Sequence, residues 1–125
     1  MGENEEQTRS RSVLVVDDEQ SMRLLCRINL ELDGHRVREA ATLADARDQI
    51  ERETPDVILL DLHIGFEDGV DLIDEIEALD LPVRVILLSG ASEVGPGLVA
   101  RVDDVLGKPF ELGELAAAVA GCPVA

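Results

Sequence analysis

The sequence predicts a doubly wound α/β fold of the (βα)5 type, in which helices cover both faces of one five-stranded parallel sheet. Short apolar runs alternate along the chain with amphipathic stretches of helical length. Two of the runs, 57–60 and 85–88, are apolar at every position, which is typical of strands buried on both faces of a sheet. The length of 125 residues suits one domain.

The first half of the chain predicts two strand–helix units. Residues 13–16 form the first strand, and a helix follows over about 19–32. Val37 marks a short second strand, and Thr42 with Asp45 three residues later resembles the start of a capped helix. Apolar residues at helical spacing define one face of the first helix and the buried face of the second: Leu25, Ile28 and Leu32, then Leu43, Ala46 and Ile50.

The second half predicts three more strands and two full helices. The strands are expected at 57–60, 83–88 and 104–106, and the helices at 68–79 and 111–120. The helix residues expected to face inward are Leu72, Ile73, Ile76, Leu79, Leu112, Leu115 and Val119. Between the last two strands, Gly95-Pro96-Gly97 opposes a regular helix, so the fourth helix is predicted to be short, distorted or partly disordered.

Composition excludes several classes of protein. The net charge of −16 and the pI of 4.2 argue against direct nucleic-acid binding, and no apolar run approaches the roughly 18 residues of a membrane span. The polar segment 1–11 is expected to be a disordered tail before a domain at 12–122, in a cytoplasmic protein without membrane insertion. Cys26 and Cys122 match no metal or redox spacing, and Cys26 is expected in the core.

Polar residues that carry chemistry follow four of the predicted strands. Asp17 and Asp18 follow the first strand, and Asp61 follows the most apolar one. Ser89 ends the next, and Lys108, the only lysine of the chain, follows the last. Because the carboxyl ends of parallel strands share one edge of the sheet, these side chains are expected to converge at a ligand site there.

This set of residues predicts a site for a divalent cation and a phosphoryl group. Mg²⁺ prefers oxygen ligands, which Asp18, Asp61 and a backbone carbonyl just beyond Asp61 can supply, while Asp17 can act through water. Asp61 is the candidate nucleophile that forms an aspartyl phosphate. Mg²⁺ and Lys108 would offset the charge on the phosphoryl oxygens, and the Ser89 hydroxyl can bond one of them.

With these residues in order, the chain resembles the receiver domains of two-component response regulators, the CheY-like fold of flavodoxin-like architecture, over residues 12–120. Each matching motif is weak alone, but together they are specific. The motifs are Val15-Val16-Asp17-Asp18-Glu19, Leu59-Leu60-Asp61-Leu62-His63 followed by Asp68-Gly69, Leu87-Leu88-Ser89-Gly90, and Leu106-Gly107-Lys108-Pro109-Phe110.

The resemblance implies a role for each of these positions. Asp61 would be the phosphoacceptor, Asp17 and Asp18 the acidic pair, Lys108 the phosphoryl-binding lysine, Ser89 the switch hydroxyl, and the His63 backbone carbonyl the third Mg²⁺ ligand. The phosphoryl group would come from a sensor histidine kinase or a histidine phosphotransfer protein. The chain would catalyse only its own phosphorylation and dephosphorylation, and it would signal to a downstream protein through contacts or onward transfer.

Three features depart from the family pattern. Val105 stands three residues before the lysine, where the family usually has an aromatic residue whose inward swing couples phosphorylation to output. Ser89 and Lys108 are 19 positions apart, fewer than in most relatives, which again shortens the fourth helix. Gly65 replaces a frequent proline, and the neighbouring Phe66 is a candidate contact for a partner.

Other functions fit the sequence less well. A docking module that works without phosphorylation is consistent with Val105 and the interrupted fourth helix. A haloacid-dehalogenase-like phosphatase would need an aspartate where His63 stands, and the chain has no room for a cap domain. A nucleotide site would need a glycine-rich loop after the first strand. The chain could also be a receiver segment of a longer kinase or regulator.

Overall fold

The main sheet has the strand order β2-β1-β3-β6-β7, and every neighbouring pair is parallel. The computed structural model describes residues 10–90 and 94–121; residues 1–9 of the predicted tail, and Cys122, lie outside them. The strands of this sheet are β1 (Ser12–Val16), β2 (Arg36–Ala40), β3 (Val57–Asp61), β6 (Arg84–Ser89) and β7 (Asp104–Gly107). The chain moves outward from β1 to β2 and then crosses back to β3, so the strand order reverses beside β1, where open α/β sheets bind ligands.

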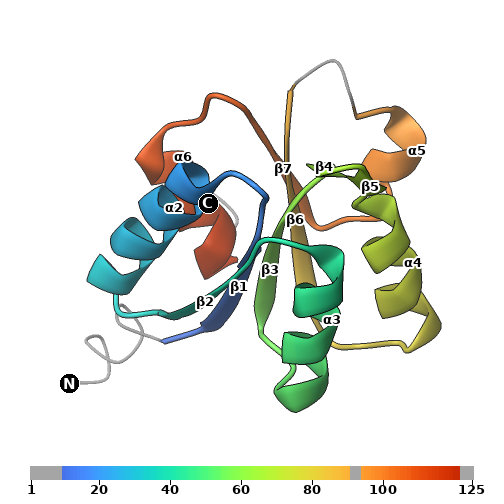
Figure 1. The fold of residues 1–125 in the computed structure, drawn as a ribbon. Coiled ribbons are helices and arrows are strands. Elements are labelled where there is room, and N and C mark those ends of the chain that lie inside the picture. The colour runs from blue at the N-terminus through green and yellow to red at the C-terminus, as the bar shows by residue number, and fades with distance from the viewer. Residues whose placement is uncertain (1–9, 91–93, 122–125) are drawn as a thin grey trace.

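Helices cover both faces of the sheet, as the sequence predicts (Figure 1). On one face lie α2 (Gln20–Leu32) and α6 (Leu112–Ala120), and on the other lie α3 (Leu43–Arg52), α4 (Val70–Ala78) and α5 (Pro96–Val99). No helix among the described residues is long and apolar enough to cross a membrane. The predicted doubly wound fold is therefore confirmed.

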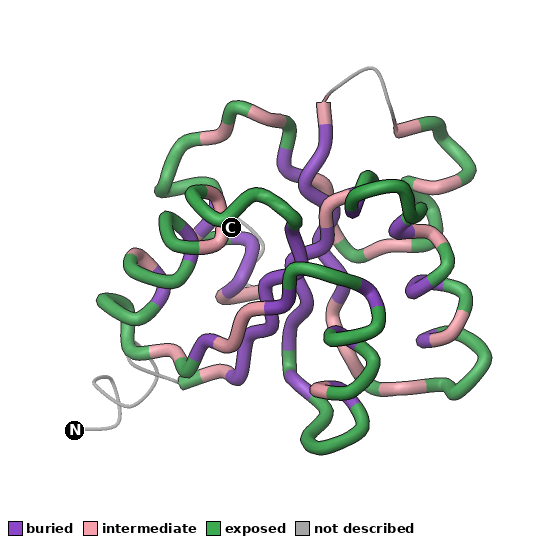
Figure 2. The backbone as a smooth tube through the Cα atoms, viewed as in Figure 1, coloured by how far each residue is buried: buried purple, intermediate pink, exposed green. Residues whose placement is uncertain are grey.

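The apolar strands feed two separate cores, one on each side of the sheet. Successive side chains of a strand point to opposite faces, so Leu14 and Val16 pack with α3 and α4, whereas Val13 and Val15 pack against α2 and α6. Figure 2 shows the result as continuous burial along the central strands. Cys26 lies in the second core, as predicted, and its burial raises the pKa of its thiol to about 11.

Most predicted inward helix faces are confirmed, but two residues that were expected inside are exposed, and α2 exposes the apolar face that the sequence defines. In α2 the buried residues are Cys26 and Leu30, while the predicted face is exposed. Leu79, just past the end of α4, and Leu112, the first residue of α6, are also exposed, at 68% and 45%. Both stand at helix ends, where the chain leaves the sheet. The exposed face of α2, in contrast, runs along the helix from Leu25 to its last residue, Leu32.

The fourth helix is short, as the sequence predicts. α5 is one turn long, with Gly95 as its N-cap and Pro96 as its first residue. Arg101, just after α5, pairs with Asp74 and Glu77 of α4 and fixes this turn against the neighbouring helix. The structure also contains a two-stranded antiparallel hairpin that was not predicted, formed by β4 (His63–Ile64) and β5 (Glu67–Asp68).

Candidate functional site

The predicted site residues meet at the carboxyl edge of the sheet, which lies at the top of Figure 1. Asp17 directly follows β1, and Asp61 is the last residue of the neighbouring strand β3. Asp61 lies opposite Leu88 of β6, so Ser89 is one residue further along that strand. Ser89 in turn lies opposite Gly107 of β7, which brings Lys108 to the same edge. Strand register alone therefore places these residues together.

Lys108 joins the two neighbouring strands through their carboxylates. Its Nζ lies 3.1 Å from Asp17 Oδ2 and 3.1 Å from Asp61 Oδ2. The Asp17 side chain is fully buried, whereas those of Asp61 and Lys108 remain 14% and 25% exposed. The pocket is thus open to solvent on the side of Asp61, where a reacting group could approach.

The charges in this pocket are only partly balanced. Burial raises the pKa of Asp17, although the Glu19 backbone N–H donates to its Oδ1 at 2.9 Å and Lys108 also lowers it. Burial lowers the pKa of Lys108, but hydrogen bonds to Asp61 and Asp17 outweigh this effect and hold the pKa above its usual value. The ammonium therefore stays charged, and a buried acid beside it remains costly to ionise.

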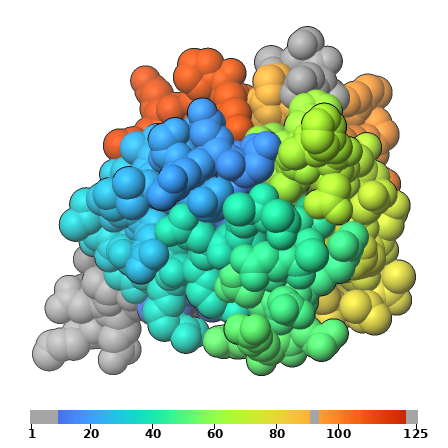
Figure 3. Space-filling model, in the orientation of Figure 1, coloured from blue at the N-terminus to red at the C-terminus, as the bar shows by residue number. Residues whose placement is uncertain are grey.

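The third carboxylate, Asp18, is held by the hairpin. Its Oδ2 accepts a hydrogen bond of 2.9 Å from the backbone N–H of Gly65, which sits at the hairpin turn with φ of +62°. A residue with a side chain is strained at that φ, so glycine suits the turn. In Figure 3 the segment after β1 (blue) meets the hairpin (yellow-green) at the molecular surface.

The three carboxylates fit a hard divalent cation. One oxygen from each of Asp17, Asp18 and Asp61 lies within 4.8 Å of the others, which is compatible with a single ion. Three acids face one ammonium here, an excess of two negative charges if all are ionised, and Asp17 is already destabilised as an anion. Oxygen donors and excess negative charge are what Mg²⁺ requires.

Ser89 and His63 lie beside this cluster. The Ser89 side chain is buried, its Oγ donates to the carbonyl of Gly90 at 3.2 Å, and its own carbonyl accepts from the Lys108 backbone N–H at 2.8 Å. The exposed His63 follows Asp61 by two residues, and its backbone N–H donates to Asp61 Oδ1 at 3.3 Å. Ser89 is thus bonded to the main chain of Lys108, and His63 is bonded to the side chain of Asp61.

Two further residues of the predicted motifs have clear surroundings. Val105 is partly buried and packs on the α3 and α4 side of the sheet. Phe66 is fully exposed at the hairpin turn, next to Gly65, whose backbone N–H bonds to Asp18. The sequence predicted neither the hairpin nor its bond to Asp18, because two-residue strands lack a readable alternation of side chains.

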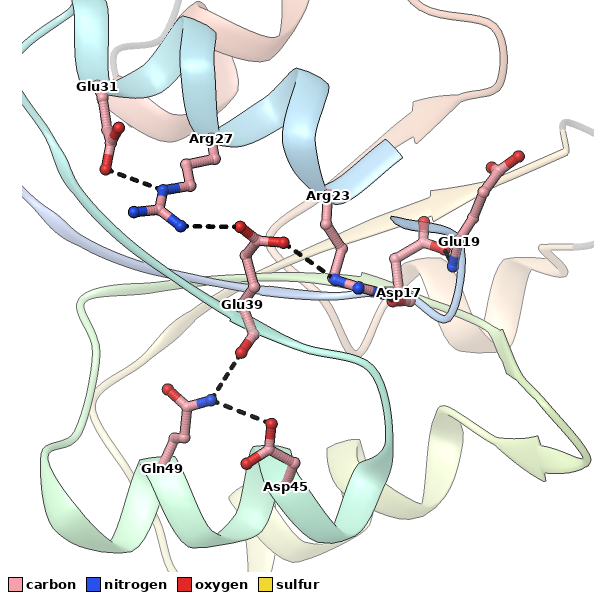
Figure 4. Close-up of polar contacts among 8 residues, drawn as sticks. All are labelled: Asp17, Glu19, Arg23, Arg27, Glu31, Glu39, Asp45 and Gln49. Atoms are coloured by element: carbon pink, nitrogen blue, oxygen red, sulfur yellow. Dashed lines mark hydrogen bonds and ion pairs between the residues drawn. The ribbon is translucent and has the colours of Figure 1, made fainter. Parts of the chain in front are cut away.

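Sequence reasoning also missed Arg23 of α2, whose side chain bonds to the backbone of Asp17 and holds it in place (Figure 4). Its guanidinium donates from Nη1 to the backbone carbonyl of Asp17 at 2.7 Å and from Nε to Glu39 at 3.1 Å. Glu39 also binds Arg27, so two turns of α2 are tied to β2. A sign of this role was present in the sequence, since Arg23 shares the i, i+3, i+7 face of α2 with the buried Cys26 and Leu30.

Comparison with protein families gives a match over nearly the whole chain. A family model described as "response regulator receiver domain" matches residues 13–120. The chain is similar to the KDP operon transcriptional regulatory protein KdpE of Escherichia coli K12, with 42% identity over 109 residues. It is also 39% identical over 113 residues to the transcriptional regulatory protein PrrA of Mycobacterium tuberculosis.

These alignments cover 85% and 88% of the chain but 48% of each relative, so the chain spans about half the length of the curated relatives it matches. Among solved structures, the receiver domain of NtrX from Brucella abortus superposes with a TM-score of 0.79 at 30% identity, covering 86% of this chain and 93% of that one. The signal receiver domain of a LuxO repressor protein from Vibrio parahaemolyticus gives a TM-score of 0.79 at 28% identity, covering 89% and 88%.

Proposed function

Because this chain belongs to the response regulator receiver domains of two-component systems, we propose that Asp61 is its phosphoacceptor. The observation that carries the proposal is the contact of Lys108 Nζ with both Asp17 and Asp61 at 3.1 Å. It sets a cation beside a partly exposed carboxylate at the end of a buried strand. That is the charge arrangement a phosphoryl group needs when it arrives at Asp61.

The reaction follows from the groups in the pocket. A carboxylate oxygen of Asp61 attacks the phosphorus of a phosphohistidine, and a P–O bond forms as the P–N bond breaks. The electron pair of the broken bond remains on the imidazole nitrogen of the donor. Lys108 stabilises negative charge on the transferred oxygens. The Ser89 hydroxyl, which donates to the Gly90 carbonyl, would exchange that bond for one to a phosphoryl oxygen.

Mg²⁺ would be held by Asp18 and Asp61 directly and by Asp17 through water, with the His63 backbone carbonyl as a further ligand. When bound, it supplies positive charge that lowers repulsion between the carboxylates and the phosphoryl oxygens. Arg23 and the Gly65 N–H keep Asp17 and Asp18 in place for this role. The donor would be a sensor histidine kinase or a histidine phosphotransfer protein, and the site would act within the cytoplasm.

Under this proposal the chain catalyses only its own phosphorylation and dephosphorylation. Phosphorylation would affect a downstream protein by a route other than the inward swing of an aromatic ring. Val105 stands three residues before Lys108, where the family usually has that ring, and the chain contains no Tyr or Trp. The one-turn α5, together with Arg101 just after it and the ion pairs of Arg101 to α4, offers a surface whose contacts can change with phosphorylation. Direct nucleic-acid contact is not expected at a net charge of −16.

Mass spectrometry after incubation with Mg²⁺ and a small acyl phosphate tests the proposal. The wild-type chain should gain one labile phosphoryl group, and Asp61→Asn should gain none. Asp56→Asn is the matched control, since it replaces an exposed aspartate just before the opposite end of the same strand and should keep the adduct. An unmodified wild-type chain would refute phosphoacceptor function and favour a docking module that works without phosphorylation.

A second test separates phosphoryl binding from its consequence. Lys108→Ala should still take up some phosphate at Asp61. However, it should lose the change in hydrogen exchange that phosphorylation causes in α5, because the cation that links Asp61 to β7 is gone. Equal exchange responses in the variant and the wild type would contradict this role of Lys108.

A further inference from the structure

The carbonyl of Asp17 lies one residue beyond the end of β1, where a side chain takes over from the sheet as its hydrogen-bond partner. Val16, the last residue of β1, is paired with Ala40 on β2 and Leu60 on β3. The Asp17 backbone N–H still donates to the Ala40 carbonyl at 3.1 Å, but its own carbonyl accepts from Arg23 Nη1 at 2.7 Å. Because Asp17 is fully buried, that carbonyl needs a donor from the protein, and Arg23 supplies it.

A second bond holds Arg23 in one orientation (Figure 4). Its Nε donates to Glu39 Oε1 on β2 at 3.1 Å, while its Nη1 donates to Asp17, and its side chain is only 14% exposed. A guanidinium is planar and rigid, so bonds from two of its nitrogens to two different acceptors prevent it from rotating freely. Hydrogen bonds from a charged donor are also stronger than those between neutral groups. The Asp17 carbonyl is therefore fixed relative to β2.

The orientation of that carbonyl affects where the next side chain lies. The Asp17 carbonyl belongs to the peptide bond that joins Asp17 to Asp18, and a peptide bond is planar. Asp18 is exposed, so it is not held by burial, and its Oδ2 accepts from the Gly65 N–H at 2.9 Å. The Gly65 bond acts on the end of the Asp18 side chain, whereas Arg23 acts on the backbone from which that side chain starts. Loss of Arg23 would therefore free the backbone that carries Asp18.

We propose that Arg23 is a positioning residue that sets the affinity of the pocket for a divalent cation, without contacting the cation or the phosphoryl group itself. By holding the peptide between Asp17 and Asp18, it keeps one oxygen from each of Asp17, Asp18 and Asp61 within 4.8 Å of the others. This inference rests on the proposed Mg²⁺ site and adds a residue on which the strength of that site depends. Replacing a residue that orients metal ligands indirectly typically changes metal affinity by about 10- to 100-fold.

Charge and position predict opposite effects when Arg23 is removed. Replacement of Arg23 by a neutral residue takes a positive charge away from the neighbourhood of a cation site, so charge alone predicts tighter binding of Mg²⁺. If Arg23 instead positions Asp18, the same replacement lets the carboxylates move apart, and Mg²⁺ binds more weakly. The sign of the change in affinity therefore distinguishes a positioning role from a purely electrostatic one.

A Mg²⁺ titration of the full chain, followed by NMR through the backbone amide of Gly65, measures this affinity without a phosphoryl donor. Arg23→Gln should raise the dissociation constant for Mg²⁺ by about tenfold or more. A constant equal to or below that of the wild type would overturn the proposal. A wild-type chain that does not respond to Mg²⁺ would remove the proposed metal site and this inference with it. Failure of Asp61 as phosphoacceptor is detected separately, by mass spectrometry, and leaves the titration valid.

Arg27→Gln is the matched control, because Arg27 lies one turn further along α2 and binds the other oxygen of Glu39 at 3.1 Å. It pairs with Glu39 and Glu31 rather than with Asp17, and its side chain is 48% exposed. Arg27→Gln removes the same charge as Arg23→Gln, but it should leave the dissociation constant within about twofold of the wild type, since exposed ion pairs contribute little. An equal loss of affinity in both variants would show that the bond to the Asp17 carbonyl is not the cause.

A second variant at the same position, Arg23→Lys, keeps the positive charge and a donor but loses the planar guanidinium. Its dissociation constant for Mg²⁺ should lie between those of the wild type and Arg23→Gln, and circular dichroism verifies that both variants are folded. A constant for Arg23→Lys above that for Arg23→Gln would mean that the charge at this position only opposes the metal, and would overturn the proposal.

The Mg²⁺ dependence of phosphoryl uptake separates positioning from general damage to the pocket. With a small acyl phosphate as donor, Arg23→Gln should need about ten times more Mg²⁺ than the wild type for half of its maximal rate. At saturating Mg²⁺ its rate should reach at least half that of the wild type, because the metal then restores the arrangement of the carboxylates. A rate that is lower by the same factor at every Mg²⁺ concentration would show a structural defect instead and contradict the positioning role.

Discussion

The backbone N–H of Lys108 donates to the carbonyl of Ser89 at 2.8 Å, continuing the ladder between β6 and β7 by one further bond. This bond fixes the start of the lysine side chain relative to the neighbouring strand. From there Nζ reaches back over β6 to Asp61 on β3 and Asp17 after β1. The backbones of Lys108 and Ser89 are thus positioned by a sheet hydrogen bond, while their side chains bond to Asp17, Asp61 and the Gly90 carbonyl at the edge of the sheet.

The first prediction concerns the loss of that ammonium. Lys108→Met keeps most of the side-chain volume but leaves the fully buried Asp17 without its cation. Without Mg²⁺ the free energy of unfolding should fall by about 1–3 kcal/mol, less than for a fully buried pair because Lys108 is partly exposed. Urea denaturation measures the change. Mg²⁺ stabilises the folded state because it binds only the folded pocket. Its effect should be larger in the variant than in the wild type, because Asp17 and Asp61 there have lost the ammonium of Lys108.

Arg52→Met is the control for this prediction. Arg52 pairs with Asp48 on the exposed surface of α3 at 3.9 Å, so its loss should leave the urea midpoint and the Mg²⁺ response nearly unchanged. A Lys108→Met chain as stable as Arg52→Met would show that the pocket tolerates its buried carboxylate without the lysine.

The positions of these residues could be predicted because they depend on strand ends. In a parallel sheet every strand ends at one edge, so the four apolar runs were enough to bring Asp17, Asp61, Ser89 and Lys108 together. The hairpin that holds Asp18 was not predictable in this way. It depends on the backbone of Gly65, whose hydrogen bond to Asp18 spans 47 positions and leaves no periodic pattern.

The face of α2 shows a different limit of sequence reasoning. Leu25, Ile28 and Leu32 satisfy the spacing of a buried face, but Cys26 and Leu30 are the residues that contact the sheet. Helical spacing identifies an apolar face without stating what it packs against. When a helix carries two such faces, the choice depends on the direction in which it leaves β1, which is a property of the tertiary structure.

The second prediction concerns Arg101, whose guanidinium pairs with Asp74 and Glu77 of α4. Arg101→Met should release the one-turn α5 and raise amide hydrogen exchange at Leu98 and Ala100, because few other contacts hold a helix of that length. Exchange along β3 should not change. Uniformly faster exchange would instead indicate a general loss of stability, and unchanged exchange at α5 would show that the ion pairs do not restrain it.

The third prediction is a dependence of stability on pH that comes from His35. Its Nδ1 accepts a hydrogen bond of 3.1 Å from the Arg11 backbone N–H, which requires that nitrogen to be unprotonated. Burial lowers the pKa of His35 below 6.5, and the Arg11 charge lowers it further, against the opposing effect of Asp33. The stabilising contribution is therefore complete above pH 6.5 and is lost as the pH falls through the lowered pKa.

Urea denaturation tests this contribution between about pH 5 and pH 8, the range in which a histidine changes charge. The difference in unfolding free energy between the wild type and His35→Gln should shrink toward the acidic end, because the protonated histidine no longer accepts the bond. His63→Gln, which replaces the exposed histidine, should keep the wild-type dependence. If the difference in unfolding free energy between the wild type and His35→Gln stayed constant across this pH range, His35 would be excluded as the source of the pH dependence.

The fourth prediction concerns the space at Gly69, between the hairpin and α4. A Cβ there would lie 2.5 Å from the backbone carbonyl oxygen of Asp61 and 3.2 Å from Leu62 Cα. Neither atom is at the end of a flexible side chain, so Gly69→Ala must displace the segment that carries Asp61. We expect a loss of about 1–3 kcal/mol in the free energy of unfolding. Phosphoryl uptake from a small acyl phosphate should also slow, because the in-line position of the carboxylate is disturbed.

Gly113→Ala is the matched substitution, since a Cβ at Gly113 in α6 meets nothing within 4 Å. It should stabilise the chain by about 0.4–1 kcal/mol through the smaller entropy of the unfolded state, with phosphoryl uptake unchanged. Thermal denaturation and timed phosphorylation of the two variants give both quantities. If Gly69→Ala matched Gly113→Ala in both, the close approach of residue 69 to the Asp61 carbonyl would have no bearing on the site. If Gly69→Ala instead loses stability and takes up phosphate more slowly while Gly113→Ala does neither, then position 69 must lack a side chain for Asp61 to be held at the edge of the sheet.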